Sequence, residues 1–491
     1  DGAGQLDQCP DKGPQWGQLT GQSAPRTVFQ GASVRKKTKE QKDYKPGFEV
    51  DVATRRNQAQ TERKQRALLL NEVQILERLI QNTPVTNPRR PDVLLRAAEA
   101  YFELQQDSTR RARALDEPIF QARGKKDQAR VKALQQQQAA LEKETGRWRQ
   151  EALRKYAILV RDHKNYPRMD EVLFSLAFGL EETGQFDRAR EVYYRLIKEH
   201  PKSRFIPNAY LAFAEYYFAQ GQMADALKFY QKVNATPPEQ NTVYGYALYK
   251  QAWCYYNLEN FKASMDRFVD VIRFATGHPE ARDGKNLARQ SLREIVLPYS
   301  QVGSPKQALS YFLKIASDRN QAMEMLESLA ELYFDTGRWD QTIEVYQKLI
   351  AEKPASERVC YWQGRITDAV ISSRPKAEQV GEGKQLVDVY KAFMRSKHPA
   401  QAKMECKQTT AGVLFQLATA WHREAVGTPQ QAGTKDRSTM RLAAQIYDRI
   451  VQEFPDIETL KFPDIARKDW PTPYRIAYYR AELLWKMEDW R

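Results

Sequence analysis

The chain has 491 residues, of which 42% are hydrophobic and 28% are charged, and its formal net charge is +15. It contains no run of 18 apolar residues, so no membrane-spanning helix is predicted. Its four cysteines are too few for a small domain held together by a disulfide framework. This length would ordinarily predict two to four compact domains.

The N-terminal segment, residues 1–50, shows neither the period of a helix nor that of a strand. Seven glycines and four prolines are spread through it. We expect an extended arm that is either disordered or laid along the rest of the chain or a partner. The next segment, residues 52–167, is expected to hold an N-terminal helix and a first helical repeat with an insertion.

The insertion occupies residues 106–150. The sequence DVLLRAAEAYFELQ (92–105) predicts one helix, but its partner EALRKYAILVRDHKNYP (151–167) follows only about 45 residues later. The residues between are strong helix formers, and Leu134, Leu141 and Trp148 recur every seven positions. We predict that both helices continue as an antiparallel hairpin with coiled-coil packing and a turn near Gly124. Polar Gln138 and Thr145 weaken its seam.

Positive charge is concentrated in the same part of the chain. Residues 31–170 contain 31 Lys and Arg against 19 Asp and Glu. The candidate basic surface consists of RKKTK (35–39), Arg110, Arg111, Arg113, Lys125 and Lys126. Such a surface suits phosphate groups, nucleic acid or an acidic protein, although a solvated face without a partner explains it as well. Nucleic-acid binding usually adds exposed aromatic side chains, whereas this region is rich in Gln and Ala.

A repeated pattern begins after the insertion, in residues 168–355. Its clearest copy is LESLAELYFDTGRWDQTIEVYQKLIAEKP (326–354), in which Ala330 and Tyr333 have one-turn spacing. Gly337 permits a left-handed helix end, and Pro354 prevents the second helix from continuing. The small residue of the second helix recurs as Ala189, Ala226, Ser264, Ala308 and Thr342, at intervals of 37, 38, 44 and 34 residues.

This pattern resembles the tetratricopeptide repeat, a helix–turn–helix unit of about 34 residues. The resemblance covers roughly residues 70–491 and implies an all-α, right-handed solenoid of about eight units, interrupted by the hairpin. Residues 356–491 continue the array irregularly, with a second-helix pattern at Ala443, Tyr447 and Ile450. The last helix lacks its partner, so the array is expected to continue past Arg491.

Enzyme motifs are missing from the sequence. GEGKQ (381–385) does not have the spacing of a phosphate-binding loop, and no GxSxG, HExxH or CxxC motif is present. The five histidines are scattered, so no metal site is predicted. We therefore expect a chain that is not an enzyme and that has no cofactor or metal.

Binding of other proteins or peptides is what the resemblance implies, because the first helices of tetratricopeptide arrays line a concave face. The register places on that face the aromatic residues Phe174, Phe178, Phe218, Tyr246, Tyr249, Trp253 and Tyr256 and the acidic residues Glu327 and Glu331. Aromatic residues dominate many binding hot spots, and such a strip would suit a basic amphipathic segment. The alternative is that the aromatic residues only fill gaps in an irregular array. Co-chaperones with tetratricopeptide domains hold the terminal carboxylate of a peptide with lysines and asparagines at set positions of the concave face. In this sequence those positions carry aromatic residues and glutamates, so a co-chaperone of that type is not expected.

Irregular repeat spacing, tyrosine-rich first helices and Pro201-Lys202-Ser203 resemble bacterial envelope proteins with these repeats, including outer-membrane assembly lipoproteins and gliding-machinery scaffolds. This implies a non-catalytic scaffold in a periplasmic or cell-envelope complex, with a cytoplasmic location as the alternative. A start at Asp1 fits a removed leader. Cys360 and Cys406 lie near the starts of successive first helices, which permits a disulfide between them, but the default expectation is that both are buried free thiols. The competing function is a nucleic-acid-associated accessory protein that uses the basic N-terminal third.

Overall fold

The computed structural model describes residues 52–488 except 282, 429, 463 and 464, and side chains from residue 61 onward apart from 62 and 468. The predicted N-terminal arm and RKKTK (35–39) therefore lie outside the described residues. The chain divides into two compact units, the first ending at Cys254 and the second beginning at Tyr255. Each is described by itself.

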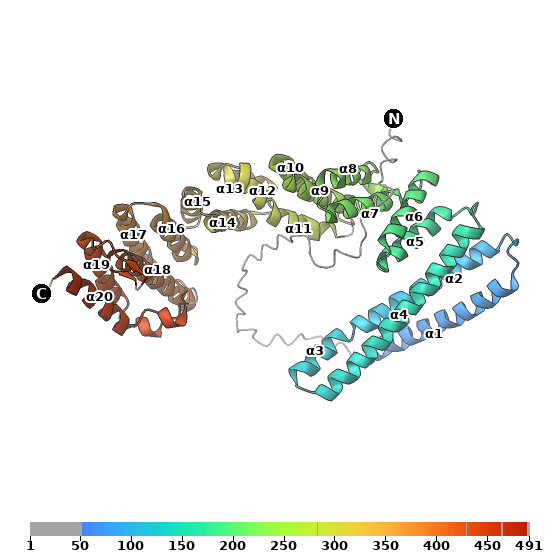
Figure 1. Cartoon of the computed structure of the whole chain (residues 1–491), viewed down its shortest axis with the longest axis horizontal. Coiled ribbons are helices and arrows are strands. Elements are labelled where there is room, and N and C mark those ends of the chain that lie inside the picture. Colours follow the sequence, from blue (N-terminus) through green and yellow to red (C-terminus); the bar gives the residue numbers. More distant parts are fainter. Residues whose placement is uncertain (1–51, 282, 429, 463–464, 489–491) are drawn as a thin grey trace. The chain divides into compact units, whose positions relative to one another are not determined.

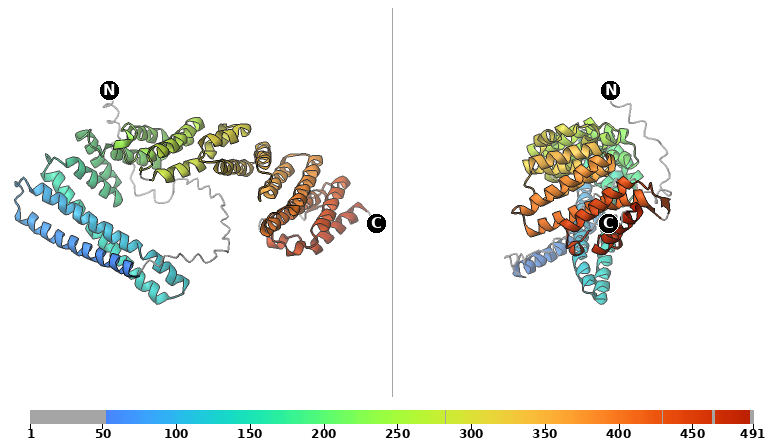
Figure 2. Two further views of the ribbon diagram at one scale, coloured as in Figure 1. Left: turned by 180° about the vertical axis from the view of Figure 1, so that it is seen from behind. Right: turned by 90° about the vertical axis from the view of Figure 1, so that its left-hand side faces the viewer.

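Three long helices form the beginning of the first unit. Helices α1 (Val52–Asn82), α2 (Arg90–Arg113) and α4 (Gln128–Asp162) lie side by side, and the short α3 (Asp116–Gly124) lies at the free end of the hairpin (Figures 1 and 2). The turn into α4 has Lys126 at φ +57°, and the Asp127 carboxylate accepts a hydrogen bond from Arg130 N at 3.0 Å. The two helices of the hairpin, α2 and α4, thus form a three-helix bundle together with α1.

The coiled-coil seam of α4 faces α2. Val131, Trp148 and Ala152 are buried, and Trp148 stacks on Tyr101 of α2 with ring centroids 5.8 Å apart. The polar seam residue Gln138 donates hydrogen bonds from Nε2 to Asp116 Oδ1 at 2.7 Å and to the Ala112 carbonyl at 3.3 Å. These bonds satisfy a polar side chain that would otherwise weaken the seam.

Regular helix pairs complete the first unit. They are α5 (Met169–Glu182) with α6 (Phe186–Glu199), α7 (Ile206–Ala219) with α8 (Met223–Val233), then the 3₁₀ turn η3 (Pro238–Gln240) and α9 (Tyr244–Asn257), whose residues from Tyr255 on belong to the second unit. Gly184 lies in the turn between α5 and α6, and Gly221 lies in the turn between α7 and α8. Both have a left-handed backbone, with φ +76° and +73°. Gln185 N donates to the Leu180 carbonyl at 3.0 Å, which caps the end of α5.

The second unit continues with α10 (Phe261–Gly277), α11 (Gly284–Glu294), α12 (Val296–Val302), η4 (Pro305–Gln307), α13 (Ala308–Ile315), α14 (Arg319–Asp335) and α15 (Trp339–Glu352). The break between α11 and α12 lies at Ile295, where Pro298 has no N–H to donate to the Glu294 carbonyl. The first helix of this repeat is therefore divided into α11 and α12. It lies in the longest interval of the array, the 44 residues between Ser264 and Ala308. Gly303 has an extended backbone (φ −81°, ψ 150°), unlike the left-handed Gly337 (φ +69°) in the turn between α14 and α15.

The end of the second unit has longer helices. They are α16 (Val359–Ser373), α17 (Lys376–Arg395), α18 (Ala400–Val426), α19 (Arg437–Glu453) and α20 (Pro473–Met487), with the 3₁₀ turns η5 (Ile457–Thr459) and η6 (Arg467–Asp469). Strands β1 (Gly427–Thr428) and β2 (Gln431–Ala432) form a small antiparallel pair that the sequence did not predict. None of the described helices is both long enough and apolar enough to cross a bilayer.

The predicted all-α class is confirmed, and so is the register of the second helices. Their small residues Ala226, Ser264, Ala308 and Thr342 are fully buried, and Ala189 is 2% exposed. The aromatic residue one turn later is buried as well, as Tyr193, Tyr230, Phe268, Phe312 and Tyr346. Each second helix therefore places one small and one aromatic side chain in the core.

Candidate functional site

Aromatic side chains lie along the first helices of the first unit. We define the aromatic row as Phe102 of α2, Phe174 and Phe178 of α5, Phe218 of α7 and Tyr246 of α9. Phe178 contacts Phe102 edge-on at a centroid distance of 6.4 Å and Phe174 at 6.3 Å. Phe178 is 39% exposed and Tyr246 is 37% exposed, so part of each ring is accessible to solvent. The row therefore offers an apolar surface to solvent.

A charged pair lies within this row. Lys250 Nζ is 3.3 Å from Glu215 Oε2 and 3.4 Å from the centroid of the Phe218 ring. The other oxygen of Glu215 accepts a hydrogen bond of 2.5 Å from the Tyr230 hydroxyl. Burial and the Glu215 charge raise the pKa of Tyr230 and of Tyr246 above their ordinary range, so both remain protonated donors. Both charges of the pair are therefore satisfied within the fold.

The other predicted residues of α9 contribute to packing. Tyr249 and Trp253 are half-buried in the first unit. Tyr256 belongs to the second unit, where it contacts Phe261 edge-on at 5.5 Å. Cys254 is fully buried, and burial raises the pKa of its thiol to about 12, as expected for an unreactive core cysteine. Part of the aromatic cluster thus fills the interior, as the alternative interpretation proposed.

The expectation of an open acidic strip in the second unit needs correction. Glu327 of α14 accepts hydrogen bonds from Nε of Arg358, the N-cap residue of α16, at 2.5 Å and from Nε1 of Trp362 in α16 at 2.9 Å. Glu331 lies 2.9 Å from Arg365 Nη2. Arg365 also lies over the Phe334 ring, 3.9 Å from its centroid. Both carboxylates are neutralised by the next first helix, so neither needs a basic ligand.

The predicted basic surface also separates into two parts. Arg110 and Arg111 each lie 2.9 Å from the carboxylate of Asp107, which Arg66 of α1 contacts at 2.6 Å. Burial would raise the pKa of Asp107, but hydrogen bonds from Arg66 and Arg110 and the charge of Arg111 hold it below its ordinary value. Arg110 is nevertheless 65% exposed, and Arg113, Lys125 and Lys126 are exposed as well. Of the predicted basic residues that the structure describes, only Arg111 is half-buried.

Two family models described as tetratricopeptide repeat match this chain, one at residues 171–203 and 246–273 and the other at residues 299–357. The matches include α5, most of α9 and α14, which carry Phe174, Phe178, Tyr246, Lys250, Glu327 and Glu331. The chain contains tetratricopeptide repeats.

Three of the solved structures that match the chain are the following. A tetratricopeptide repeat protein from Parabacteroides merdae is 13% identical with a TM-score of 0.28, covering 64% of this chain and 98% of its own. The quorum sensor NprR from B. thuringiensis is 14% identical, with a TM-score of 0.27 and coverage of 69% and 94%. The TPR2AB domain of yeast Sti1 in complex with pHSP90 is 11% identical, with a TM-score of 0.26 and coverage of 65% and 99%. No curated protein has significant similarity to the chain.

Tetratricopeptide repeats are generally non-catalytic interaction modules, and no catalytic family matches this chain. Among the residues that the structure describes, no group of three or more His, Cys, Asp or Glu side chains could hold a metal ion. The repeats themselves support a role in protein–protein interaction.

A disulfide joins two first helices of the second unit. Cys360 of α16 and Cys406 of α18 are bonded, with their Cα atoms 5.2 Å apart. Both side chains are buried, at 1% and 2% exposure. The bond closes a loop with a sequence separation of 46 and encloses α17. It therefore restricts the unfolded chain over a complete repeat.

Proposed function

We propose that this tetratricopeptide-repeat chain is a non-catalytic scaffold that holds partner proteins in a multiprotein complex of the bacterial cell envelope. The observation that carries the proposal is the exposed part of the aromatic row, Phe178 and Tyr246, on first helices of repeats that match the family models. Binding of proteins or peptides is the usual task of such repeats. Aromatic side chains provide large contact area at a small entropic cost.

The charges of the repeats narrow the chemistry of the partner. The carboxylates of Glu215, Glu327 and Glu331 already have Lys250, Arg358 and Arg365 as partners. A basic segment would have to displace these intramolecular pairs, and each displaced cation would then lose its partner. We therefore expect the aromatic row to take an apolar or aromatic segment of a partner rather than a strongly basic one.

The envelope setting is supported by the disulfide between Cys360 and Cys406. Disulfides persist in oxidising compartments such as the bacterial periplasm and are rare in the cytosol. In native cells, fractionation should place the chain with the envelope. Recovery of the chain in the cytosol with both thiols reduced would contradict this part of the proposal.

Co-purification from native membranes tests the scaffold itself. Replacing Phe178→Ala and Tyr246→Ala together should release partners that the unmodified chain retains. The control carries Leu313→Ala and Val451→Ala, which remove comparably exposed apolar side chains (41% and 51%) from α13 and α19. If the double variant in the aromatic row kept every partner, this row would not be the binding surface.

The alternative of nucleic-acid binding has little support from the described contacts. Arg110 and Arg111 are engaged by Asp107, and Phe120 is the single aromatic residue of α3. The remaining test is binding to random oligonucleotides at low salt, where even non-specific electrostatic binding is strong. We expect none.

A further inference from the structure

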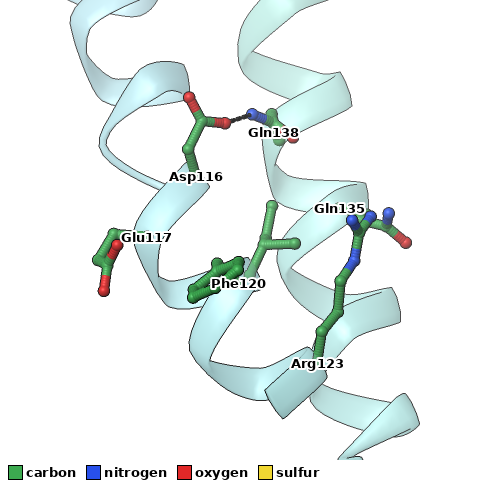
Figure 3. Close-up of a pocket in the computed structure, with 7 residues that line it drawn as sticks. Asp116, Glu117, Phe120, Arg123, Gln135 and Gln138 are labelled. Atoms are coloured by element: carbon green, nitrogen blue, oxygen red, sulfur yellow. Dashed lines mark hydrogen bonds between the residues drawn. The ribbon is translucent and has the colours of Figure 1, made fainter. Parts of the chain in front are cut away.

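The free end of the hairpin carries an exposed aromatic side chain far along the sequence from the repeat motifs. Phe120 of α3 is 73% exposed, although its neighbour Ile119 is 6% exposed and packs inside the hairpin. Figure 3 shows that Phe120 borders a shallow pocket between α3 and α4. Its lining consists of Asp116, Glu117, Ile119, Phe120, Arg123, Gln135 and Gln138.

The pocket itself is lined by one basic residue, Arg123, and two acidic residues, Asp116 and Glu117, but the hairpin end as a whole is basic. The exposed cations of the hairpin end are Arg113, Arg123, Lys125, Lys126, Arg130 and Lys132. The acidic residues of the same region are fewer and have local roles. Asp116 accepts a hydrogen bond from Gln138 at 2.7 Å, Glu117 accepts one from Gln121 at 2.7 Å, and Asp127 caps α4. The end of the hairpin, which also carries the exposed Phe120, therefore has more positive than negative side chains.

We propose that the end of the hairpin, centred on Phe120, Lys125 and Lys126, binds an acidic segment of a partner protein that places an apolar side chain against Phe120. The inference rests on the proposed scaffold function and adds a second surface to it. Opposite charge draws the two proteins together, and the aromatic ring provides the apolar contact. The amide groups of Gln135 and Gln138 at the pocket can exchange hydrogen bonds with a peptide.

The same groups favour a protein over an anionic membrane. Asp116 and Glu117 lie about one turn from Phe120 on α3, so the acidic side chains of a partner segment have to face Lys125 and Lys126 while its apolar side chain meets Phe120. A continuous phosphate surface cannot separate its charges in this way. A single phenylalanine also provides little apolar area for insertion into lipid. A peptide can accommodate the mixed charges, because its side chains can be placed individually.

Fluorescence anisotropy with the full chain and labelled synthetic peptides tests the proposal. The probe is an amphipathic helical peptide of Glu and Leu, and its counterpart has Lys in place of Glu. We expect the acidic peptide to bind, with an affinity that falls as salt is raised, and the basic counterpart not to bind. Phe120→Ala should weaken binding about tenfold, as for a hot-spot residue. Lys125→Glu with Lys126→Glu should weaken it at least as much.

Two controls make the outcome specific. Lys285→Glu with Lys306→Glu reverses two exposed lysines of the second unit and should change the affinity less than about twofold. Phe178→Ala in the aromatic row should also leave binding of the acidic peptide unchanged. Circular dichroism checks that each variant is folded, as expected for the exposed positions.

Several results would overturn this proposal. They are equal binding of the acidic peptide by the unmodified chain and the Phe120→Ala variant, binding of the basic peptide, or no binding of either. Loss of binding in Phe178→Ala alone would move the acidic peptide to the aromatic row and leave the scaffold function intact. Sedimentation with phosphatidylserine vesicles that depends on Phe120 would instead assign the surface to a membrane.

Discussion

In the first unit, the ammonium group of Lys250 lies 3.3 Å from the Glu215 carboxylate and joins α9 to α7. The Lys250 side chain is only 12% exposed, whereas that of Glu215 is 36% exposed. The pair thus lies at the edge of the aromatic row, where one charge is shielded and the other touches solvent. It links the neighbouring first helices α7 and α9 beside the aromatic rings that we propose as the surface for a partner.

Replacing Lys250→Met should lower the free energy of unfolding by about 1–2 kcal/mol, because the ion pair and the contact with Phe218 are both lost. The partial exposure of Glu215 keeps the cost below that of a fully buried pair. The control is Lys228→Met, since Lys228 pairs only with Asp225 of its own helix and is 64% exposed. Urea unfolding should show a change of less than about 0.5 kcal/mol for the control. Equal effects of both variants would refute the structural role of Lys250.

Removing Arg358 and Arg365 should create the acidic strip that the unmodified chain lacks. In the double variant Arg358→Ala with Arg365→Ala, Glu327 and Glu331 lose their guanidinium partners. A labelled Lys and Leu peptide should then bind the variant measurably more tightly than the unmodified chain. The matched control, Arg319→Ala, removes an exposed arginine that pairs with Glu352 at the end of α15. Tight binding of the basic peptide to the unmodified chain would show that the carboxylates are not neutralised as described.

Reduction of the Cys360–Cys406 disulfide should destabilise the second unit by about 2–4 kcal/mol, because the closed loop of 46 residues restricts the unfolded chain. Replacing both cysteines by Ser should reproduce the lower urea midpoint and make it insensitive to reductant. Alkylation in denaturant without reductant should leave Cys360 and Cys406 unlabelled in protein from native cells. Labelling of both under these conditions would contradict the bond.

Acidification should weaken the packing of α18 against α20 through His422. This side chain is 6% exposed, and Nε2 lies 3.3 Å from Glu482 Oε2. Burial lowers the pKa of His422 below its ordinary value of 6.5, although Glu482 acts in the opposite direction. The unfolded chain therefore binds a proton first as the pH falls, so this contribution is present above pH 6.5 and is lost below it.

The corresponding measurement is the urea midpoint between pH 7.5 and 5.5. The unmodified chain should lose stability over this interval, and His422→Gln should lose less. His200, an intermediate-exposure residue at the end of α6, provides the control substitution His200→Gln. An identical pH profile for the unmodified chain and His422→Gln would exclude His422 as the source.

The residues that could be predicted from the sequence follow the period of the repeat. Tyr346 is buried because it lies one turn from Thr342 on the packed side of its helix, and Gly337 is left-handed because the turn between the helices requires it. Both requirements are local, so the sequence displays them. The helix break at Ile295 could have been inferred in part from Pro298.

Contacts between repeats could not be predicted in the same way. Glu327 and Glu331 looked free because their partners Arg358 and Arg365 are 31 and 34 residues further on, in another helix. Arg66 likewise contacts Asp107 across 41 residues, which joins α1 to the hairpin. Surface charges have no period that would reveal their partners, and many pairings satisfy the same composition. The aromatic residues of α9 could either line a binding surface or fill gaps in the array. That choice depends on their burial, which the sequence alone does not show.

The central claim is that partners contact the aromatic row, and site-specific photo-crosslinking in native cells tests it most directly. A photoreactive phenylalanine analogue placed at Phe178 or Tyr246, which are 39% and 37% exposed, should give discrete adducts with other proteins. The same analogue at Leu313, 41% exposed on α13, should give none of these adducts. With the analogue at Tyr246, loss of the adducts when Phe178→Ala is also introduced would support the assignment. No adducts from Phe178 and Tyr246, with discrete adducts from Leu313, would contradict it.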